Sequence, residues 1–334
     1  MKVMISRRQF LKTTAAASLF PVLNSCGRSN LWDGEAYRKT RRSRVAILAA
    51  ESYDKPLHEI VLRGLKLFAL DVRGKRILLK PNLVEFDPNG IINTHPALVE
   101  AAITAFERSG AREVIVAEGP GHRRDNEYLL RASGLYAVMK EHRIRYVDLN
   151  SDDVQLTKLR SRFTRFNELY LPKTLFNADL VVSMPKLKTH HWAGVTLSLK
   201  NMFGVIPGSI YGWPKNALHW AGIHGSILDI NSSLPAPQFA IVDGIVGMEG
   251  NGPIQGQAKN SGVLIFGSDL VAVDATAARV MKIEPRKISY LQMAGEFLGN
   301  LATERIEQIG DQLDKFQQDF RVIQEFQEIK SLTG

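Results

Sequence analysis

The segment Asp179-Leu-Val-Val-Ser-Met-Pro-Lys-Leu-Lys188 decides the fold, because an apolar run of strand length leads directly into two lysines. It continues as THHWAGVTLSLKNMFGVIPG over residues 189–208, which adds two adjacent histidines, a third lysine and three glycines. A buried strand that ends in basic residues is typical of a parallel sheet, in which ligands bind beyond the carboxyl ends of the strands. We therefore expect an α/β protein with its site at this strand end.

The spacing within this segment separates the roles of its polar residues. An extended backbone points Lys186 and Lys188 in the same direction, toward an anion or a carboxylate. Ten residues separate His190 from Lys200, and Gly194 between them allows a sharp turn or the close approach of a ligand. The segment indicates anion capture or catalysis, and the alternative is a solvated basic loop.

The rest of the chain alternates between short apolar runs and helical periodicity. Such alternation predicts a mostly parallel sheet with flanking helices and right-handed crossovers. The expected strands cover residues 45–50, 76–80, 113–117, 145–149, 179–183, 238–242 and 262–267, and the expected helices cover residues 58–69, 95–108, 128–141, 270–281 and 291–299.

The length of the chain after residue 44 leaves two organisations open. About 290 residues are enough for one large domain or for two lobes with a cleft between them. We assign residues 45–283 to the α/β domain. Residues 284–334 are predicted to form a helical C-terminal extension with a polar, glutamine-rich end.

Polar residues follow several of the expected strands. They are Lys80 and Asn82 after one strand, Glu118 after another, Lys186, Lys188 and His190 after a third, and Asp243 and Glu249 after a fourth. Because the carboxyl ends of parallel strands meet at one edge, these side chains are expected to form a cleft of lysines, carboxylates and histidines. Taken singly, each is equally compatible with a strand-end solvent residue or a turn.

The N-terminal residues predict export. Ser6-Arg-Arg-Gln-Phe-Leu-Lys12 is a twin-arginine signature, and the apolar run behind it is shorter than the roughly 18 residues of a membrane span. Leu23-Asn-Ser-Cys-Gly27 resembles a bacterial lipobox, in which Cys26 is lipidated. We expect residues 1–26 to be a signal peptide read by the twin-arginine machinery. The protein would then be membrane-anchored on the periplasmic or cell-surface side.

The charge and the cysteine content of the chain limit the classes of partner and cofactor that it can bind. Lys2, Arg7, Arg8 and Lys12 leave with the signal, which reduces the formal net charge from +9 to +5. The tether over residues 27–44 is basic and favours an anionic membrane surface. Since no nucleic-acid motif or aromatic-interleaved basic face occurs, we predict no nucleic-acid partner. Cys26 is the only cysteine, which leaves none for an iron–sulfur cluster.

Six segments together resemble the DUF362 family. They are Leu79–Asn82, Asn93–Pro96, Asp179–His190, Gly194–Gly204, Asp243-Gly244 and Ser268–Asp274. The resemblance covers residues 45–283 and is most specific in the lysine–histidine–lysine–asparagine pattern that ends at Asn201. It implies no settled activity. Many members carry a ferredoxin-type iron–sulfur segment, and this chain lacks its cysteines.

The spacing His190-x3-Gly194-x5-Lys200 is similar to a segment of the nickel-pincer lactate racemases. That resemblance implies a lactate-racemase-like fold, with His190 as acid/base and Lys200 bound covalently to a pyridinium-derived cofactor. It also makes His95 a candidate second catalytic histidine, and His219 or His224 candidate nickel ligands, since imidazole suits that metal. Leu197 and Ser198 replace two glycines of the racemases.

Three functions remain open. The first is an enzyme of racemase or oxidoreductase type that acts on a small carboxylated substrate, with Lys80, Asn82, Glu118, Lys186, Lys188 and Asn201 binding the substrate. The second is a lipid-anchored protein that binds a small anion without turnover. The third is a metal-binding or metal-delivery protein that uses His190, His191, His219, His224, Asp243 and Glu249 to hold a divalent metal.

Overall fold

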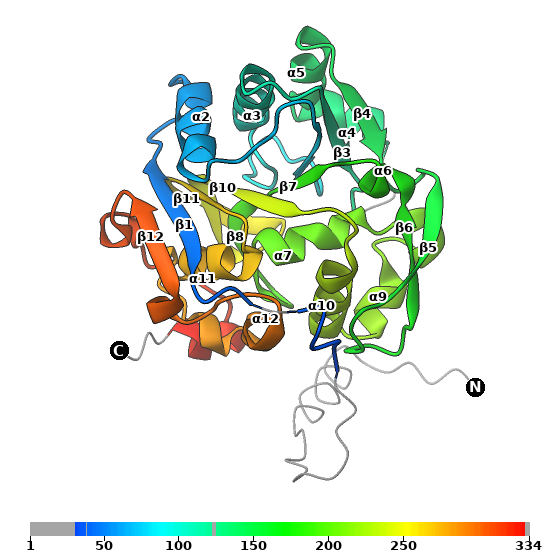
Figure 1. The fold of residues 1–334 in the computed structure, drawn as a ribbon. Helices are drawn as coiled ribbons and strands as arrows, with labels where there is room; N and C mark the ends of the chain where they lie inside the picture. Colours follow the sequence, from blue (N-terminus) through cyan, green and yellow to red (C-terminus); the bar gives the residue numbers. More distant parts are fainter. Residues whose placement is uncertain (1–30, 38, 122–124, 331–334) are drawn as a thin grey trace, which may run out of the picture. The chain divides into compact units, whose positions relative to one another are not determined.

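A ten-stranded sheet organises the described part of this computed structural model, which comprises residues 31–37, 39–121 and 125–330 (Figure 1). Its order is β12-β1-β11-β10-β7-β2-β3-β4, and β8 joins it through β10 and carries β9. The strands are β1 (Ser43–Ala49), β2 (Arg76–Pro81), β3 (Glu113–Glu118), β4 (Arg145–Asp148), β7 (Leu180–Met184), β8 (Lys186–His190), β9 (Gly194–Thr196), β10 (Gln238–Asn251), β11 (Gln255–Gly267) and β12 (Ile306–Gly310). A separate antiparallel hairpin pairs β5 (Val154–Lys158) with β6 (Glu168–Pro172).

The pairing confirms the predicted α/β class. Strands β10, β7, β2, β3 and β4 run parallel to one another, whereas β11 is antiparallel to both β1 and β10. The parallel strands end on the same side of the sheet, so the residues after β2, β3 and β7 come together there.

Helices cover both faces of the sheet (Figure 1). Side chains alternate between the two cores: Ala46 and Leu48 of β1 pack with the first helix layer, and Val45 and Ile47 pack with the second. The first layer is α2 (Leu57–Leu67), α3 (Pro96–Arg108), α4 (Asn126–Ala132) and α5 (Leu135–Glu141); the second includes α7 (Ser198–Asn201), α10 (Ile223–Ser233), α11 (Leu270–Val280) and α12 (Ser289–Phe297). Shorter helices are α6 (Lys173–Phe176), α8 (Gly208–Tyr211) and α9 (Asn216–Trp220).

Several predicted elements differ in length from the observed ones, among them β11, which begins at Gln255 and not at residue 262. The single helix expected over residues 128–141 is divided into α4 and α5 at Gly134, whose φ of 81° lies in the left-handed region. The short strand expected over residues 238–242 extends to Asn251 as β10, although this stretch is rich in glycine. Glycine is required there because a Cβ at Gly247 would lie 2.6 Å from the Leu187 carbonyl oxygen of β8.

The C-terminal segment is helical only in part. It contains α12, but residues Ile306–Gly310 form β12, which pairs in parallel with β1 at the edge of the sheet. Three-residue and longer 3₁₀ turns make up most of the rest, ending with Gln324–Lys330. The described residues from Trp32 onward form one compact unit.

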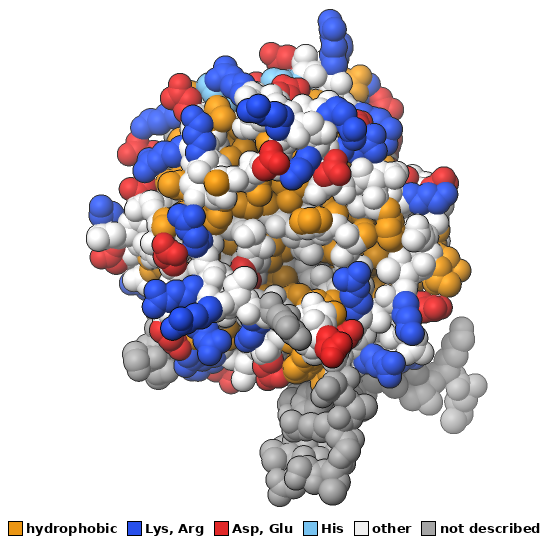
Figure 2. Space-filling view, in the orientation of Figure 1, with side chains coloured by type: hydrophobic (Ala, Val, Ile, Leu, Met, Phe, Trp, Pro, Cys, Tyr) orange, Lys and Arg blue, Asp and Glu red, His pale blue; other side chains and the backbone are white. Residues whose placement is uncertain are grey.

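The predicted export features lie outside the described residues. These are the twin-arginine signature, the lipobox with Cys26 and the first part of the tether. Within the residues that are described, no helix combines the length and apolar character needed to cross a bilayer. On the face shown in Figure 2, lysine and arginine side chains are interspersed with aspartate and glutamate.

A buried ion pair connects β8 to β10. Lys186 Nζ lies 2.6 Å from Asp243 Oδ2, and both side chains are almost fully buried. The hydroxyl of Tyr53 donates to Asp243 Oδ1 at 2.7 Å and accepts from Lys186 Nζ at 2.9 Å, and the His95 backbone N–H donates to Asp243 Oδ2 at 2.9 Å. The polar side-chain atoms of Lys186, Asp243 and Tyr53 therefore all have hydrogen-bond partners.

We expect Asp243→Asn to lower the free energy of unfolding by about 3–5 kcal/mol, because it leaves the Lys186 ammonium buried without its counter-charge. Urea unfolding at pH 7 measures the change. The control is Glu113→Gln, which breaks the more exposed pair with Arg76 and should change stability by less than about 1 kcal/mol. Equal losses for the two variants would contradict a stabilising role for the Lys186–Asp243 pair.

Candidate functional site

A cavity of about 270 Å³ lies where β2 and β3 end and where β8 and α7 pass. Its wall contains four lysines, three histidines and one carboxylate, together with Asn82, Thr196, Asn201, Trp192 and Phe203. The charged and titratable residues are Lys80, Glu118, Lys188, His190, His191, Lys200, Lys215 and His219. The cavity is small and rich in nitrogen donors, which suits a small anionic ligand.

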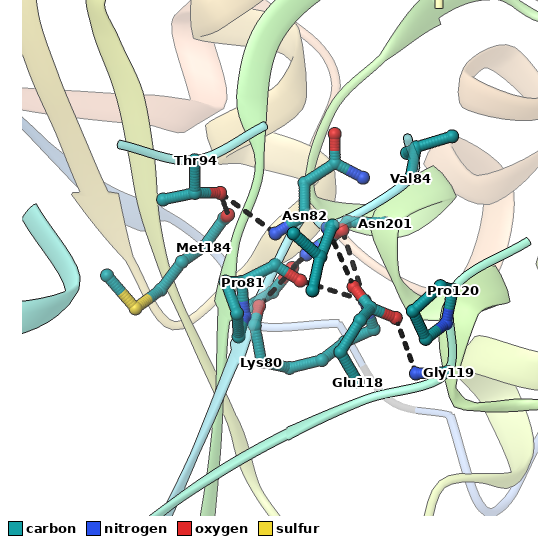
Figure 3. Close-up of polar contacts among 12 residues, drawn as sticks. Lys80, Pro81, Asn82, Val84, Thr94, Glu118, Gly119, Pro120, Met184 and Asn201 are labelled. Atoms are coloured by element: carbon teal, nitrogen blue, oxygen red, sulfur yellow. Dashed lines mark hydrogen bonds and ion pairs between the residues drawn. The ribbon is translucent and has the colours of Figure 1, made fainter. Parts of the chain in front are cut away.

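The Lys80–Glu118 ion pair forms one wall of the cavity (Figure 3). Lys80 Nζ donates to Glu118 Oε2 at 2.5 Å, to Asn201 Oδ1 at 3.2 Å and to the Pro81 carbonyl at 3.1 Å, so its three donors are all used. Glu118 also accepts from the backbone N–H groups of Leu83 and Gly119. Burial lowers the pKa of Lys80, and the Glu118 carboxylate opposes that shift.

Helix α7 places Lys200 and Asn201 over this pair. Its first two N–H groups, from Ser198 and Leu199, donate to the buried carboxylate of Asp274 at 2.7 and 2.9 Å. Asn201 Nδ2 donates to the Lys80 carbonyl at 3.2 Å and so fixes the helix to β2. The chain then passes Glu118 at Gly204, where a Cβ would lie 2.7 Å from Lys80 Nζ and closer still to the carboxylate.

Lys188 is a fully buried lysine without a carboxylate partner in the described part of the chain. Its Nζ donates to the carbonyl oxygens of Ile92 at 2.8 Å and Pro253 at 3.3 Å. Burial, followed by the nearby Lys200 charge, lowers the pKa of Lys188 well below that of an ordinary lysine. One of its three N–H positions remains for a ligand.

Lys200 and Lys215 bring two further amines to the same cavity. Burial lowers the pKa of Lys200 to about 8, with the Lys80 charge adding to the effect. Burial also lowers the pKa of Lys215 to about 7, and Glu118 opposes this. Lys215 Nζ donates to the Gly119 carbonyl, whereas the Lys200 amine makes no hydrogen bond within the described residues and lies 4.6 Å from the centroid of the Phe203 ring.

The hydrogen bonds of the three histidines assign their ring protons. His190 Nδ1 accepts from the backbone N–H groups of Trp192 and Ala193, which puts the ring proton of the neutral form on Nε2. His191 Nδ1 lies 2.8 Å from the Gly252 carbonyl and His219 Nδ1 lies 3.1 Å from the Lys215 carbonyl, so each donates through Nδ1 and keeps a lone pair on Nε2. Burial lowers the pKa of His190 well below its usual value and that of His219 to about 4.

His190 was predicted to act as both acid/base and metal ligand, but its tautomer limits it to hydrogen-bond donation. In the neutral form its Nε2–H is a hydrogen-bond donor. The lone pairs that could accept a proton or bind a metal belong to His191 and His219.

Most of the predicted substrate residues line the cavity, but Lys186 and His95 do not. Lys80, Asn82, Glu118, Lys188 and Asn201 are in its wall, together with His190 and Lys200. Lys186 is paired with Asp243, and the His95 ring stacks on Tyr53 with centroids 3.8 Å apart. His95 also accepts the Ala97 N–H through Nδ1 as the N-cap of α3, so it has a local structural role.

The six residues predicted as metal ligands are dispersed. His190, His191 and His219 line the cavity, whereas Asp243 binds Lys186 and Glu249 binds Arg321 and Lys259. His224 lies on α10, where its ring stacks on Tyr290. Within the described residues, no three His, Cys, Asp or Glu side chains gather in an arrangement that could hold a metal ion.

Sequence reasoning missed Lys215 and Thr196. Lys215 follows Gly212-Trp213-Pro214 and has a left-handed backbone with a φ of 64°, which turns its side chain away from any regular pattern. Thr196 lies directly across from Lys188 in the β8–β9 ladder. For Lys215, the only signal in the sequence is the group of turn residues around Pro214. For Thr196, the signal is a β-branched residue that lies opposite a lysine.

The fold and this site define an α/β protein with a lysine-lined ligand cavity. The chain belongs to the DUF362 family, described as a domain of unknown function, whose model matches residues 77–279. A thylakoid-associated protein of Synechocystis sp. is 30% identical over 223 residues, which cover 64% of this chain and 65% of the relative. The chain therefore spans slightly less than two thirds of that relative's length.

Two solved structures resemble parts of the chain. One is a structural-genomics protein of Thermotoga maritima, with a TM-score of 0.34, 14% identity and coverage of 64% of this chain and 56% of that chain. The other is the lactate racemase apoprotein of Thermoanaerobacterium thermosaccharolyticum, with a TM-score of 0.41, 16% identity and coverage of 66% and 55%.

We expect Lys200 to react with an amine-acylating reagent along a curve whose midpoint lies near pH 8, because burial favours its neutral form. Peptide mass spectrometry after brief labelling between pH 6 and 11 measures the curve. The exposed Lys173 provides the reference curve in the same digest. A Lys200 midpoint at the ordinary lysine value of about 10.4 would contradict the environment described for its amine.

Proposed function

We propose that the cavity is the active site of an enzyme of racemase or oxidoreductase type that acts on the carbon beside a carboxylate of a small substrate. The observation that supports this most directly is the Lys200 amine. It lines the cavity without an ionic partner in the described residues, and burial brings its pKa to about 8. Enzymes use lysines tuned in this way as bases, nucleophiles or attachment points near neutral pH.

The surrounding residues supply the other functions that such a reaction needs. The Lys188 ammonium, held by two carbonyls, would bind the substrate carboxylate, and His190 Nε2–H would donate to the same oxygens. A proton removed from the substrate carbon would pass to the Nε2 lone pair of His191 or His219. The Lys80–Glu118 pair keeps the Glu118 carboxylate occupied and the wall rigid.

A covalently held, metal-bearing cofactor fits two features of this site. The Lys200 amine is available for a covalent bond, and His219 Nε2 is available to a metal. Leu197 and Ser198, which replace glycines of the racemases, are buried outside the cavity wall and do not fill it. When bound, such a cofactor would supply a Lewis acid for the negative charge that remains when the proton leaves the substrate carbon; the residues above would bind the substrate and move that proton.

Deuterium exchange at the substrate carbon tests the proposal. Protein purified from its native host is incubated in D₂O with a panel of small 2-hydroxy acids and dicarboxylic acids, and mass spectrometry follows deuterium uptake. We expect exchange with at least one acid, and a loss of at least about 100-fold in Lys200→Ala, as is typical for removal of an acid/base group. The control Lys173→Ala, which breaks an exposed pair with Asp153, should stay within twofold of wild type.

The same experiment separates the enzyme from an anion-binding protein. If acids bind but none of them exchanges deuterium, the proposal is wrong and the non-catalytic alternative is supported. Intact-mass analysis of the same sample examines the cofactor: an added mass located on Lys200 supports a covalent tether, and an unmodified Lys200 in an active preparation overturns it.

We also propose that the protein is exported by the twin-arginine pathway and anchored through a lipid on Cys26. The support is the Ser6–Lys12 signature, the lipobox and the basic residues 39–44 before and within the start of β1. Replacing Arg7 and Arg8 by lysine should leave uncleaved precursor in the cytoplasm, as followed by cell fractionation. The control Lys12→Arg should be exported normally, and export of the Arg7/Arg8 variant would overturn the assignment.

A further inference from the structure

The charges of the cavity wall are not balanced. Among the residues that the structure describes, it contains four lysines and only one carboxylate, Glu118. Glu118 is paired with Lys80 at 2.5 Å, and this pair is complete because Lys80 has used its three donors. Lys188, Lys200 and Lys215 are therefore left without a carboxylate partner among the residues that the structure describes.

The hydrogen-bond donors of these three amines are only partly used. Lys188 donates to two carbonyls and Lys215 to the carbonyls of Gly119 and Pro120, which leaves one N–H on each ammonium. Lys200 donates to no described residue, and His190 adds an Nε2–H. The wall therefore offers donors from four different side chains.

An unpartnered hydroxyl points to the same kind of ligand. Thr196 Oγ1 is buried, has no hydrogen-bond partner within the described residues and belongs to the cavity wall. It lies across the β8–β9 ladder from Lys188, so the hydroxyl and the free N–H of that lysine come from neighbouring positions. Buried polar groups in proteins are normally hydrogen-bonded, so an oxygen-rich occupant would complete this pair.

We propose that the ligand of this cavity is a small dianion, such as a dicarboxylate or a phosphate-like group, and not a monocarboxylate. These three amines can all carry positive charge in the same wall only when the occupant supplies negative charge. The amines come from β8, α7 and the turn before α9, so one anionic group cannot take all of their donors. The inference rests on the proposed function and narrows its substrate class.

Proton linkage gives this proposal a second readout. Before binding, burial holds the pKa of Lys200 at about 8 and that of Lys215 at about 7, so both amines are largely neutral above pH 8. A dianion stabilises the ammonium forms and raises both pKa values, so binding takes up protons. The charged and titratable groups around these amines are Lys80, Glu118, Asp148, Lys188, His190 and His219.

Calorimetric titration of the full protein at pH 8 tests the inference with four probes: succinate, sulfate, propionate and lactate. We expect the two dianions to bind at least about tenfold more tightly than the two monoanions. Repeating each titration in buffers of different ionisation enthalpy should show proton uptake with the dianions. Tighter binding of sulfate than of succinate would identify a phosphate-like ligand, and the reverse order a dicarboxylate; both results support two charges.

Lysine variants test which residues cause the preference for dianions. Lys215→Met should reduce the preference for succinate over propionate about tenfold, whereas the exposed control Lys173→Met should leave it unchanged. The comparison of probes on the wild-type protein needs no variant, so it decides the question even if Lys215→Met does not fold. Lactate or propionate binding as tightly as succinate and sulfate overturns the inference while the deuterium-exchange result stands. Dianion binding without deuterium exchange removes the proposed reaction and leaves the inference intact.

Discussion

The buried Lys80–Glu118 ion pair is the interaction on which the arrangement of the cavity depends. It joins the ends of β2 and β3, and through Asn201 it holds α7 against the sheet. Because a buried ammonium needs every donor satisfied, the positions of Pro81, Asn201 and Glu118 are fixed together. Gly204 follows from the same constraint, since a side chain there would occupy the space of the carboxylate.

The Lys80–Glu118 pair leaves the other lysines of the cavity wall without a counter-charge. The only carboxylate that the described residues bring to the cavity is paired with Lys80, so the other three lysines face the ligand space with unbalanced charge. Their environment is stable when the amines are neutral or when an anion is present, and burial moves the pKa of Lys200 and Lys215 toward that balance. The same imbalance makes the amines suitable for binding and for chemistry near neutral pH.

Two lysines that lie two residues apart in β8 illustrate how tertiary contacts separate similar residues. Lys186 and Lys188 lie at alternating positions of the same strand, and both are buried. Lys186 donates to Asp243 and Tyr53, and its ion pair with Asp243 contributes to stability. Lys188 meets only carbonyls and faces the cavity, so it remains able to bind a ligand. Strand alternation predicted their common direction, but their partners lie 57 to 133 residues away in the chain.

The sequence by itself determined the α/β class, most of the strands and helices, and the rim at which the polar residues gather. Local periodicity and the strand-end rule are sufficient for that, as the positions of Lys80, Glu118 and Lys188 show. Only the tertiary structure decided that β12 completes the edge of the sheet, that His95 and Lys186 lie outside the cavity and that Lys215 lies inside it. The physical reason is that charge pairing, hydrogen-bond acceptors and burial depend on residues that are distant in the chain, and these decide which titratable groups remain free for a ligand.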